Sequence, residues 1–174
     1  RTRGRRRFPE FVVGRLSRPD PAKFPPDFPE SYLRLKLRDP RFRVMAWSEE
    51  MARQYPEGFR GRWDLLPAGA EEAVRFLHSL DLFVYDLRKD FTESWGRAVV
   101  EAMLTGAVPL VTGAARHHLR NLVPHGEGGY LCGAKAEWRA HAQRLQGDVA
   151  LRRRMARAAR DHAERELCDA VRHR

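Results

Sequence analysis

Short apolar segments alternate with helical segments along almost the whole chain, and this alternation limits the fold more than any other feature of the sequence. Residues 81–85 are nearly all apolar, which is typical of a strand buried on both faces. Further strands are predicted at 10–14, 42–47, 63–67, 107–112 and 128–132, and helices at 30–38, 49–55, 71–80, 94–105, 134–146 and 148–166. Because such alternation is typical of parallel sheets, we expect an α/β, Rossmann-like three-layer domain with a mostly parallel six-stranded sheet and helices on both faces.

The length and composition agree with one folded domain. The chain has 174 residues, of which 43% are hydrophobic, enough for a single core. It contains no apolar run near the roughly 20 residues that span a bilayer. The basic start is followed by no apolar stretch, so it does not read as a signal peptide. We expect a basic tail or linker over 1–9, the folded domain over 10–166 and a C-terminal tail over 167–174.

The net charge of +10 suggests an anionic partner. Arginines gather in residues 1–7 and again around 152–154, and such charge can bind nucleic acid or an anionic membrane. Because no aromatic residues interleave these arginines, as they do in single-strand binders, we interpret both groups as solvated and expect no nucleic-acid partner. An alternative stays open, in which the chain is a non-catalytic Rossmann-like module whose basic tail associates with nucleic acid or membrane.

Several common sites are missing from the sequence. It has neither the GxGxxG of nicotinamide dehydrogenases nor the GxxxxGK[ST] of P-loop NTPases, and it lacks the GxSxG elbow of α/β-hydrolases. The spacing of His117, His118 and His125 fits no common zinc site, so we expect no metal. Cys132 and Cys168 indicate reduced thiols and a cytoplasmic setting rather than a disulfide framework.

The loop and helix after the fourth strand carry the strongest candidates. Ligands of open parallel sheets bind at the carboxyl ends of the strands, where loops lead into helices. Gly96 allows a ligand to approach the backbone of the first turn, whose N–H groups favour an anion such as a diphosphate. Glu93 either complements the helix dipole or accepts hydrogen bonds from sugar hydroxyls. Glu101 lies in an apolar helix, so it is exposed, paired with Arg97, or directed at the hydroxyls of a ribose.

Cations follow the first strand. Arg15 comes directly after Gly14, and Arg18 and Lys23 follow in a proline-rich loop, so all three are predicted at the carboxyl edge, where a diphosphate needs neutralising. With 33 lysines and arginines in the chain, position alone favours Arg15 over the others. At the far edge of the sheet, we expect the loop near Leu66 and Pro67 to read a nucleobase.

In their order along the chain, these segments resemble the C-terminal, donor-binding domain of GT-B glycosyltransferases, in particular the retaining enzymes of family 4. Glu93 and Glu101 have the spacing of the family's Glu-x7-Glu motif, and residues 101–111 are similar to its Glu-Ala-Met-Ala-x-Gly-x-Pro-Val-Val run. Residues 13–18 resemble its Val-Gly-Arg-Leu opening, residues 80–85 its fourth strand, and residues 125–131 its Asn-Gly-x-Asn-Gly-Leu-Leu turn. The resemblance covers roughly residues 10–166.

The resemblance implies a metal-independent, front-face transfer of a hexosyl group from a UDP- or GDP-type sugar to an unknown acceptor, without a cofactor. Arg15 and Lys23 would neutralise the leaving diphosphate, Glu93 would hold the sugar, and Glu101 the ribose. The remaining donor-binding residues would be Ser94, Trp95, Gly96, Arg97 and Arg18. Such enzymes work between two domains, so we expect a missing N-terminal domain and an inactive isolated chain. We also expect a cytoplasmic protein with peripheral contact at the inner face of the membrane.

The sequence departs from the family pattern at four places. Ser94-Trp95-Gly96 stands where Gly-Phe-Gly is usual, and Lys23 lies further from Arg15 than in the common pattern. The second strand ends in residues 46–48, Ala-Trp-Ser, instead of Gly-x-Gly, and residues 114–116 replace the Gly-Gly and Glu after the fifth strand. A different GT-B enzyme, such as an epimerase or a phosphorylase, is a narrower alternative, although no lysine stands in a setting that would support a phosphorylase.

Overall fold

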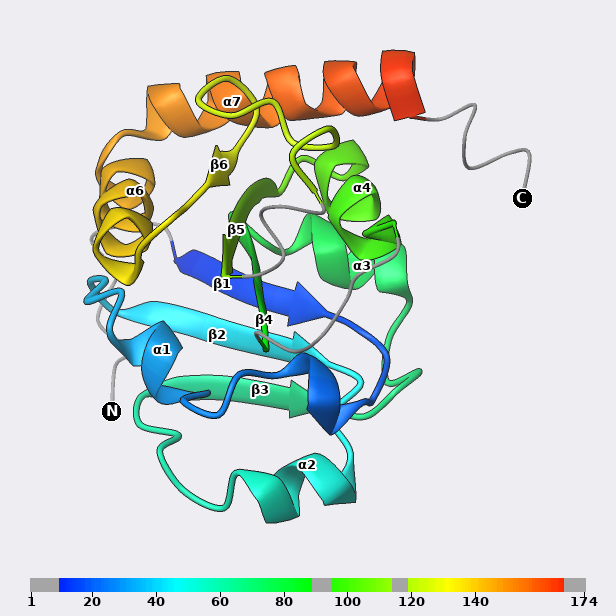
Figure 1. Ribbon diagram of the computed structural model, residues 1–174, viewed down its shortest axis with the longest axis vertical. Helices are drawn as coiled ribbons and strands as arrows, with labels where there is room; N and C mark the ends of the chain where they lie inside the picture. The colour runs from blue at the N-terminus through cyan, green and yellow to red at the C-terminus, as the bar shows by residue number, and fades with distance from the viewer. Residues whose placement is uncertain (1–9, 89–94, 114–118, 168–174) are drawn as a thin grey trace, which may run out of the picture.

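The computed structural model describes residues 10–88, 95–113 and 119–167, which form a three-layer α/β domain (Figure 1). Its strands are β1 (Phe11–Leu16), β2 (Pro40–Met45), β3 (Arg62–Leu66), β4 (Leu82–Leu87), β5 (Val108–Gly113) and β6 (Tyr130–Leu131). They form one six-stranded sheet in the order β3-β2-β1-β4-β5-β6, and every pairing is parallel. The expected fold class is therefore confirmed.

Helices cover both faces of the sheet. They are η1 (Pro21–Lys23, 3-10), α1 (Glu30–Leu33), α2 (Glu49–Gln54), α3 (Ala73–His78), α4 (Arg97–Leu104), α6 (Lys135–Gly147), α7 (Val149–His162) and the π-helical η2 (Ala163–Leu167). Buried side chains of α3 and α4 form one core with the sheet, and those of α1, α2 and α6 form the other. α7 lies on the β6 side of the sheet and contributes Leu151 and Met155 to one core and Ala159 to the other (Figure 1).

The strand order contains a switch point between β1 and β4. From β1 the chain adds β2 and β3 on one side, and it then returns to add β4, β5 and β6 on the other. In such sheets the loops on either side of the switch point diverge, and they leave a crevice at the carboxyl ends of the two central strands. Gly14 keeps β1 close to its neighbours here, because a Cβ atom at this residue would lie 2.5 Å from Leu80 Cδ2 and 2.8 Å from the Arg43 carbonyl oxygen.

Most element boundaries differ from the predicted ones by only a few residues, but α1 is much shorter than expected. The predicted helix over 30–38 ends at Leu33, and Lys36 adopts a left-handed backbone with φ of 50°. The side chain of Gln143 in α6 donates hydrogen bonds to the carbonyl oxygens of Leu35 and Lys36, at 3.0 and 3.2 Å. Contacts from α6 therefore stabilise a turn where local spacing predicts a helix.

Two local predictions can be checked at helix starts. Ser48 is the N-cap of α2, and its Oγ accepts a hydrogen bond from the backbone nitrogen of Met51 at 3.2 Å, as the sequence predicts. α4 begins at Arg97 rather than near residue 94, because Gly96 is an N-cap with φ of 75° and so does not belong to the helix. Among the described residues, no helix has the length and the apolar composition that crossing a membrane requires.

Candidate functional site

Arg15 is completely buried at the carboxyl end of β1, beside the switch point. Its Nη1 donates a hydrogen bond to the backbone carbonyl oxygen of Asp86 in β4, and its Nη2 donates one to that of Lys23 at 3.0 Å. The guanidinium carbon lies 4.1 Å from the centre of the Phe24 ring and 5.1 Å from that of Tyr85, so two aromatic faces stabilise the charge. Arg15 therefore places a positive charge at the carboxyl end of β1 and joins β1, β4 and the end of η1.

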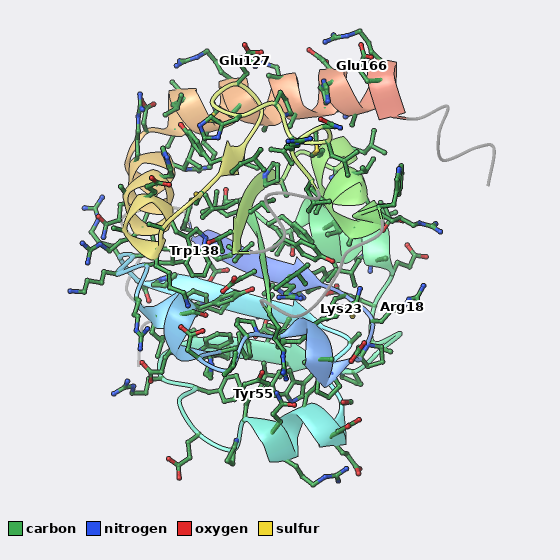
Figure 2. The ribbon with its side chains drawn as sticks, in the orientation of Figure 1. Arg18, Lys23, Tyr55, Glu127, Trp138 and Glu166 are labelled. Carbon is green, nitrogen blue, oxygen red and sulfur yellow. The ribbon has the colours of Figure 1, made fainter. Side chains whose placement is uncertain are left out.

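The loop after β1 brings two predicted phosphate-binding residues together. Asp20 is the N-cap of η1 and accepts a hydrogen bond from the backbone nitrogen of Ala22 at 2.9 Å. η1 ends at Lys23, whose carbonyl oxygen is the acceptor for Arg15. Arg18 is exposed in the same loop, and Figure 2 shows Arg18 and Lys23 on the side toward which the arrows of β1, β2 and β3 point. The three predicted cations thus belong to one short region of the carboxyl edge.

Asp86 is a buried carboxylate one residue beyond the strand predicted at 81–85. It lies within β4 and is only 3% exposed. Burial raises the pKa of Asp86 to about 6, although the charges of Lys135 and Arg15 act in the opposite direction. Lys135, the first residue of α6, has its Nζ 4.0 Å from Asp86 Oδ2 and also forms an ion pair with Asp27. The signal that could have revealed Asp86 is an acidic residue at the end of an otherwise apolar run.

The start of α4 lies after the carboxyl end of β4 and is closely packed. A Cβ atom at Gly96 would lie 2.3 Å from Leu119 Cδ2, so only glycine fits both the space and the φ of 75°. The side chain of Trp95 packs against the core on this face of the sheet. The backbone nitrogen of Val99 already donates to the carbonyl oxygen of Gly96 at 2.9 Å, whereas the N–H groups of Arg97 and Ala98 precede this first helical bond. Because Gly96 offers no capping side chain, these two N–H groups are suited to an anion. The other residues predicted here, Glu93 and Ser94, lie outside the described residues.

Glu101 lies on the partly exposed face of α4. Its side chain is 36% exposed, and its Oε1 is 2.8 Å from Nε of Arg97, one helical turn earlier. Of the arrangements that the sequence left open, the structure thus contains the pair with Arg97. Such exposed i,i+4 pairs stabilise a helix by only about 0.3–0.5 kcal/mol, so a ligand hydroxyl can compete for the carboxylate at little cost. The role of Glu101 in holding a ribose stays a prediction.

The predicted nucleobase edge lies at the end of β3, the outermost strand on one side. Leu66 is the last residue of β3, and its carbonyl oxygen accepts a hydrogen bond from the backbone nitrogen of Trp47 at 2.8 Å; Pro67 follows and is exposed. Before Trp47, Ala46 has a φ of 68°. A left-handed backbone costs a non-glycine residue about 1–2 kcal/mol. The chain therefore adopts at Ala46 a backbone shape that favours glycine.

In the described part of the chain, no group of three or more His, Cys, Asp or Glu residues is placed to hold a metal ion. His125 has a structural contact, because its Nδ1 accepts a hydrogen bond from the backbone nitrogen of Leu131 at 3.0 Å. Cys132 is buried, and burial raises the pKa of its thiol to about 12. His117, His118 and Cys168 lie outside the described residues.

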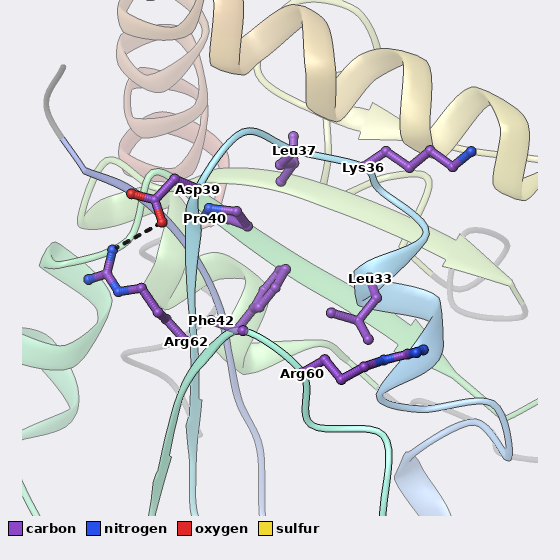
Figure 3. A pocket seen from close by; sticks show the side chains of 9 residues that line it. Leu33, Lys36, Leu37, Asp39, Pro40, Phe42, Arg60 and Arg62 are labelled. Atoms are coloured by element: carbon purple, nitrogen blue, oxygen red, sulfur yellow. Dashed lines mark ion pairs between the residues drawn. The ribbon is translucent and has the colours of Figure 1, made fainter. Parts of the chain in front are cut away.

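A pocket of about 230 Å³ lies at the opposite edge of the sheet, at the amino ends of β2 and β3 (Figure 3). Its arginines already have acidic partners. Arg60 pairs with Glu30 at 2.7 Å, and Arg62 pairs with Glu10 and, at 3.8 Å, with Asp39. This pocket lies away from the carboxyl edge, and its arginine charge is balanced, so we do not assign the predicted site to it.

No protein-family model matches the sequence, and no curated protein is significantly similar to it. Among solved structures, Anabaena HepE in complex with UDP and glucose matches with a TM-score of 0.72 and 21% identity over 93% of this chain and 46% of its own. WaaG, a glycosyltransferase involved in lipopolysaccharide biosynthesis, matches with a TM-score of 0.67 and 15% identity over 91% of this chain and 44% of its own.

A structure of one domain alone matches more evenly. The C-terminal domain of LpcC, a glycosyl transferase group 1 family protein from Francisella tularensis, has a TM-score of 0.67 and 19% identity over 90% of this chain and 85% of its own. The chain therefore spans less than half the length of HepE and WaaG, but most of the LpcC domain. At these identities the likeness shows the fold alone, and that fold is the Rossmann-like domain of GT-B glycosyltransferases.

Proposed function

We propose that this chain is the donor-binding half of a retaining, family-4 type glycosyltransferase that moves a hexosyl group from a nucleoside-diphosphate sugar to an acceptor. The observation that carries the proposal is the buried guanidinium of Arg15 beside the switch point, hydrogen-bonded to the backbone of Lys23. Solved neighbours support the ligand class, because HepE has been crystallised with UDP-glucose and the pneumococcal O-GlcNAc transferase GtfA with UDP and GlcNAc.

The diphosphate would bind between the loop after β1 and the start of α4. Lys23 and Arg18 are the cations that contact it, because Arg15 is fully buried and its guanidinium donates to two carbonyl oxygens. Arg15 acts from below, through its charge in a poorly solvated site and through its hydrogen bond to the Lys23 backbone. Backbone N–H groups near Gly96 and Arg97 complete the site at the positive end of the α4 dipole.

The rest of the donor would be held by the two carboxylates and the edge of the sheet. Glu93 would accept hydrogen bonds from hydroxyls of the transferred sugar, and Glu101 from the ribose in place of Arg97. Ser94 and Trp95 would contribute further contacts to the donor, and the loop at Leu66 and Pro67 would contact the nucleobase.

In the transfer itself, the bond between the anomeric carbon and the diphosphate oxygen breaks while the acceptor oxygen bonds to the same face of that carbon. Because attack and departure occur on the same face, the configuration is retained, and the acceptor proton moves to the leaving phosphate oxygen. Lys23 and Arg18 would neutralise the diphosphate without a metal ion. The protein's main contribution is stabilisation of the charge that develops on the leaving group, which is often the largest single contribution to such catalysis.

The acceptor would be bound by a second domain. The chain covers 46% of HepE and 85% of the isolated LpcC domain, which supports an N-terminal partner domain in the complete protein. The isolated chain is then expected to bind nucleotide weakly and to transfer no sugar.

Titration of the chain with UDP, GDP and ADP by calorimetry or NMR tests the proposal. We expect one of the three to bind at micromolar to millimolar concentration and to bind more weakly to Lys23→Ala and Glu101→Gln variants. Glu164→Gln is a matched control, because Glu164 in η2 forms the same kind of i,i+4 pair, with Arg160 at 2.7 Å, and is not among the predicted donor-binding residues. No binding of any of the three nucleotides at millimolar concentration would refute the proposal.

A further inference from the structure

We infer that Tyr55 is a positioning residue of the donor site, because its hydroxyl fixes the backbone that carries Lys23. This inference rests on the proposed function. Tyr55 follows α2 as its C-cap residue and is 5% exposed. Its hydroxyl lies 3.1 Å from the carbonyl oxygen of Phe24 and 3.0 Å from that of Pro25. In Figure 2, Tyr55 lies between α2 and the strands, on the same side of the molecule as α2 and η1.

The hydroxyl of Tyr55 is positioned to donate its proton to the carbonyl oxygens of Phe24 and Pro25. The side-chain nitrogen of Gln54 donates a hydrogen bond to Tyr55 Oη at 2.8 Å, so the tyrosine oxygen is already an acceptor there. Its single proton can then be shared between the two neighbouring carbonyl oxygens. Burial raises the pKa of Tyr55, so the proton remains on the oxygen at neutral pH.

Residues 23–25 are held from two sides. The carbonyl oxygen of Lys23 accepts the hydrogen bond from Arg15 Nη2 at 3.0 Å, and the next two carbonyl oxygens accept from Tyr55. The ring of Phe24 lies over the Arg15 guanidinium and is 1% exposed. Three successive carbonyl groups are thus bound to buried side chains, which is unusual for a surface loop and limits the positions that the Lys23 side chain can reach.

α2 is anchored well enough to serve as a support. Ser48 caps the start of α2, and the side chain of Met51, a residue of the helix, is completely buried. The ring of Tyr55 itself packs at 5.4 Å from that of Phe28, in an edge-to-face arrangement. Removal of the hydroxyl alone would leave this packing intact and would remove only its bonds to the carbonyl oxygens of Phe24 and Pro25, the two residues that follow Lys23.

The test is a Tyr55→Phe variant of the chain, titrated with UDP and, separately, with uridine. If GDP or ADP is the nucleotide that binds, it and its nucleoside are used instead. We expect the affinity for the diphosphate to fall about three- to tenfold, the effect of losing one hydrogen bond, and the affinity for the nucleoside to stay unchanged. In a Lys23→Ala background the same substitution should have no further effect, because the side chain that it positions is gone.

Two more variants complete the experiment. Tyr130→Phe removes a hydroxyl from a buried tyrosine in β6 and should leave both affinities unchanged. Gln54→Ala alters an exposed residue and should weaken diphosphate binding in the same direction if Tyr55→Phe proves poorly folded. An equal loss for nucleoside and diphosphate, no loss at all, or full additivity with Lys23→Ala would overturn the inference, whereas failure of the unaltered chain to bind any nucleotide would overturn the proposed function itself.

Discussion

Arg15 in β1 donates a hydrogen bond to the backbone carbonyl oxygen of Asp86 in β4, a residue 71 positions further along the chain. The two residues stand on either side of the switch point of the sheet. The bond joins the half of the sheet formed by β1, β2 and β3 to the half formed by β4, β5 and β6, and it holds the Arg15 side chain inside the protein. Arg15 is therefore part of the structural support of the site as well as a source of positive charge.

Substitution of Arg15 should cost stability, in contrast to substitution of its exposed neighbour. Arg15→Met leaves the carbonyl oxygens of Asp86 and Lys23 without their donor, and an unsatisfied buried acceptor costs about 1–3 kcal/mol. We expect the free energy of unfolding in urea to fall by about 1–3 kcal/mol. Arg18→Met changes an exposed side chain and should stay within about 0.5 kcal/mol of the unaltered chain. Equal stability of the two variants would contradict the structural role of Arg15.

Glu101→Gln should separate ligand binding from stability. The pair with Arg97 is exposed, so its loss should lower the free energy of unfolding by no more than about 0.5 kcal/mol. The amide oxygen of glutamine would replace a charged acceptor for ribose hydroxyls by a neutral one. Nucleotide binding should then weaken about tenfold, since hydrogen bonds to charged groups contribute about 1.5–3 kcal/mol and neutral ones about 0.5–1.5 kcal/mol. Calorimetric titration and thermal unfolding of the same sample measure both effects. A stability loss without an affinity loss would assign Glu101 to the helix alone.

Gly96→Ala should be more harmful than a glycine substitution with the same backbone strain. Both Gly96 and Gly106 have positive φ, 75° and 87°, but only at Gly96 would the new Cβ meet a neighbour, Leu119 Cδ2 at 2.3 Å. Gly106→Ala therefore measures the cost of the left-handed backbone, about 1–2 kcal/mol. We expect Gly96→Ala to exceed it by about 1–3 kcal/mol, the cost of overpacking, and to weaken nucleotide binding. Denaturant unfolding of the two variants decides the comparison, and equal losses would exclude the close contact with Leu119.

The buried carboxyl of Asp86 should make stability depend on pH. Its pKa in the folded protein, about 6, is above the ordinary value of 3.8, so the folded state binds the proton more tightly than the unfolded state. The resulting advantage is complete below pH 3.8 and is lost as the pH rises through about 6. Relative to Asp86→Asn, the free energy of unfolding should fall by roughly 2 kcal/mol between pH 4 and pH 7.

Urea unfolding of both proteins at intervals across this range provides the measurement for Asp86. The difference between the two curves matters, because other groups that titrate contribute equally to both. A difference that stays constant or grows with pH would mean that Asp86 is ionised at little cost, and that Lys135 and Arg15 compensate its burial more fully than their positions indicate.

The periodicity of the sequence predicts the elements, and most of their ends to within a few residues, but not the end of α1. Strands such as β4 were predicted correctly because burial on both faces leaves a continuous apolar run. α1 was not, because the end of that helix depends on Gln143 and Gln146 of α6, whose side chains bind the carbonyl oxygens of the turn after Leu33 from about 108 positions away. No window of neighbouring residues contains that information.

For the candidate site too, the sequence predicts which elements carry the residues but not the contacts of their side chains. The positions of Arg15, Lys23 and Glu101 on their elements followed from the order of strands and helices, since the carboxyl ends of parallel strands share one edge. The direction of the Arg15 side chain, the burial of Asp86 and the contacts of Tyr55 did not follow, because each depends on a partner in another element.

The sequence by itself determined the α/β class, the approximate strands and helices, and the edge of the sheet where cations and helix starts meet, because these follow from local hydrophobic periodicity and the geometry of parallel sheets. Only the tertiary structure decided which of the cations faces solvent and which is buried. A cation can be buried only where carbonyl oxygens, aromatic rings and acidic groups from other segments stabilise its charge. Only folding brings such partners together, as it does at Arg15.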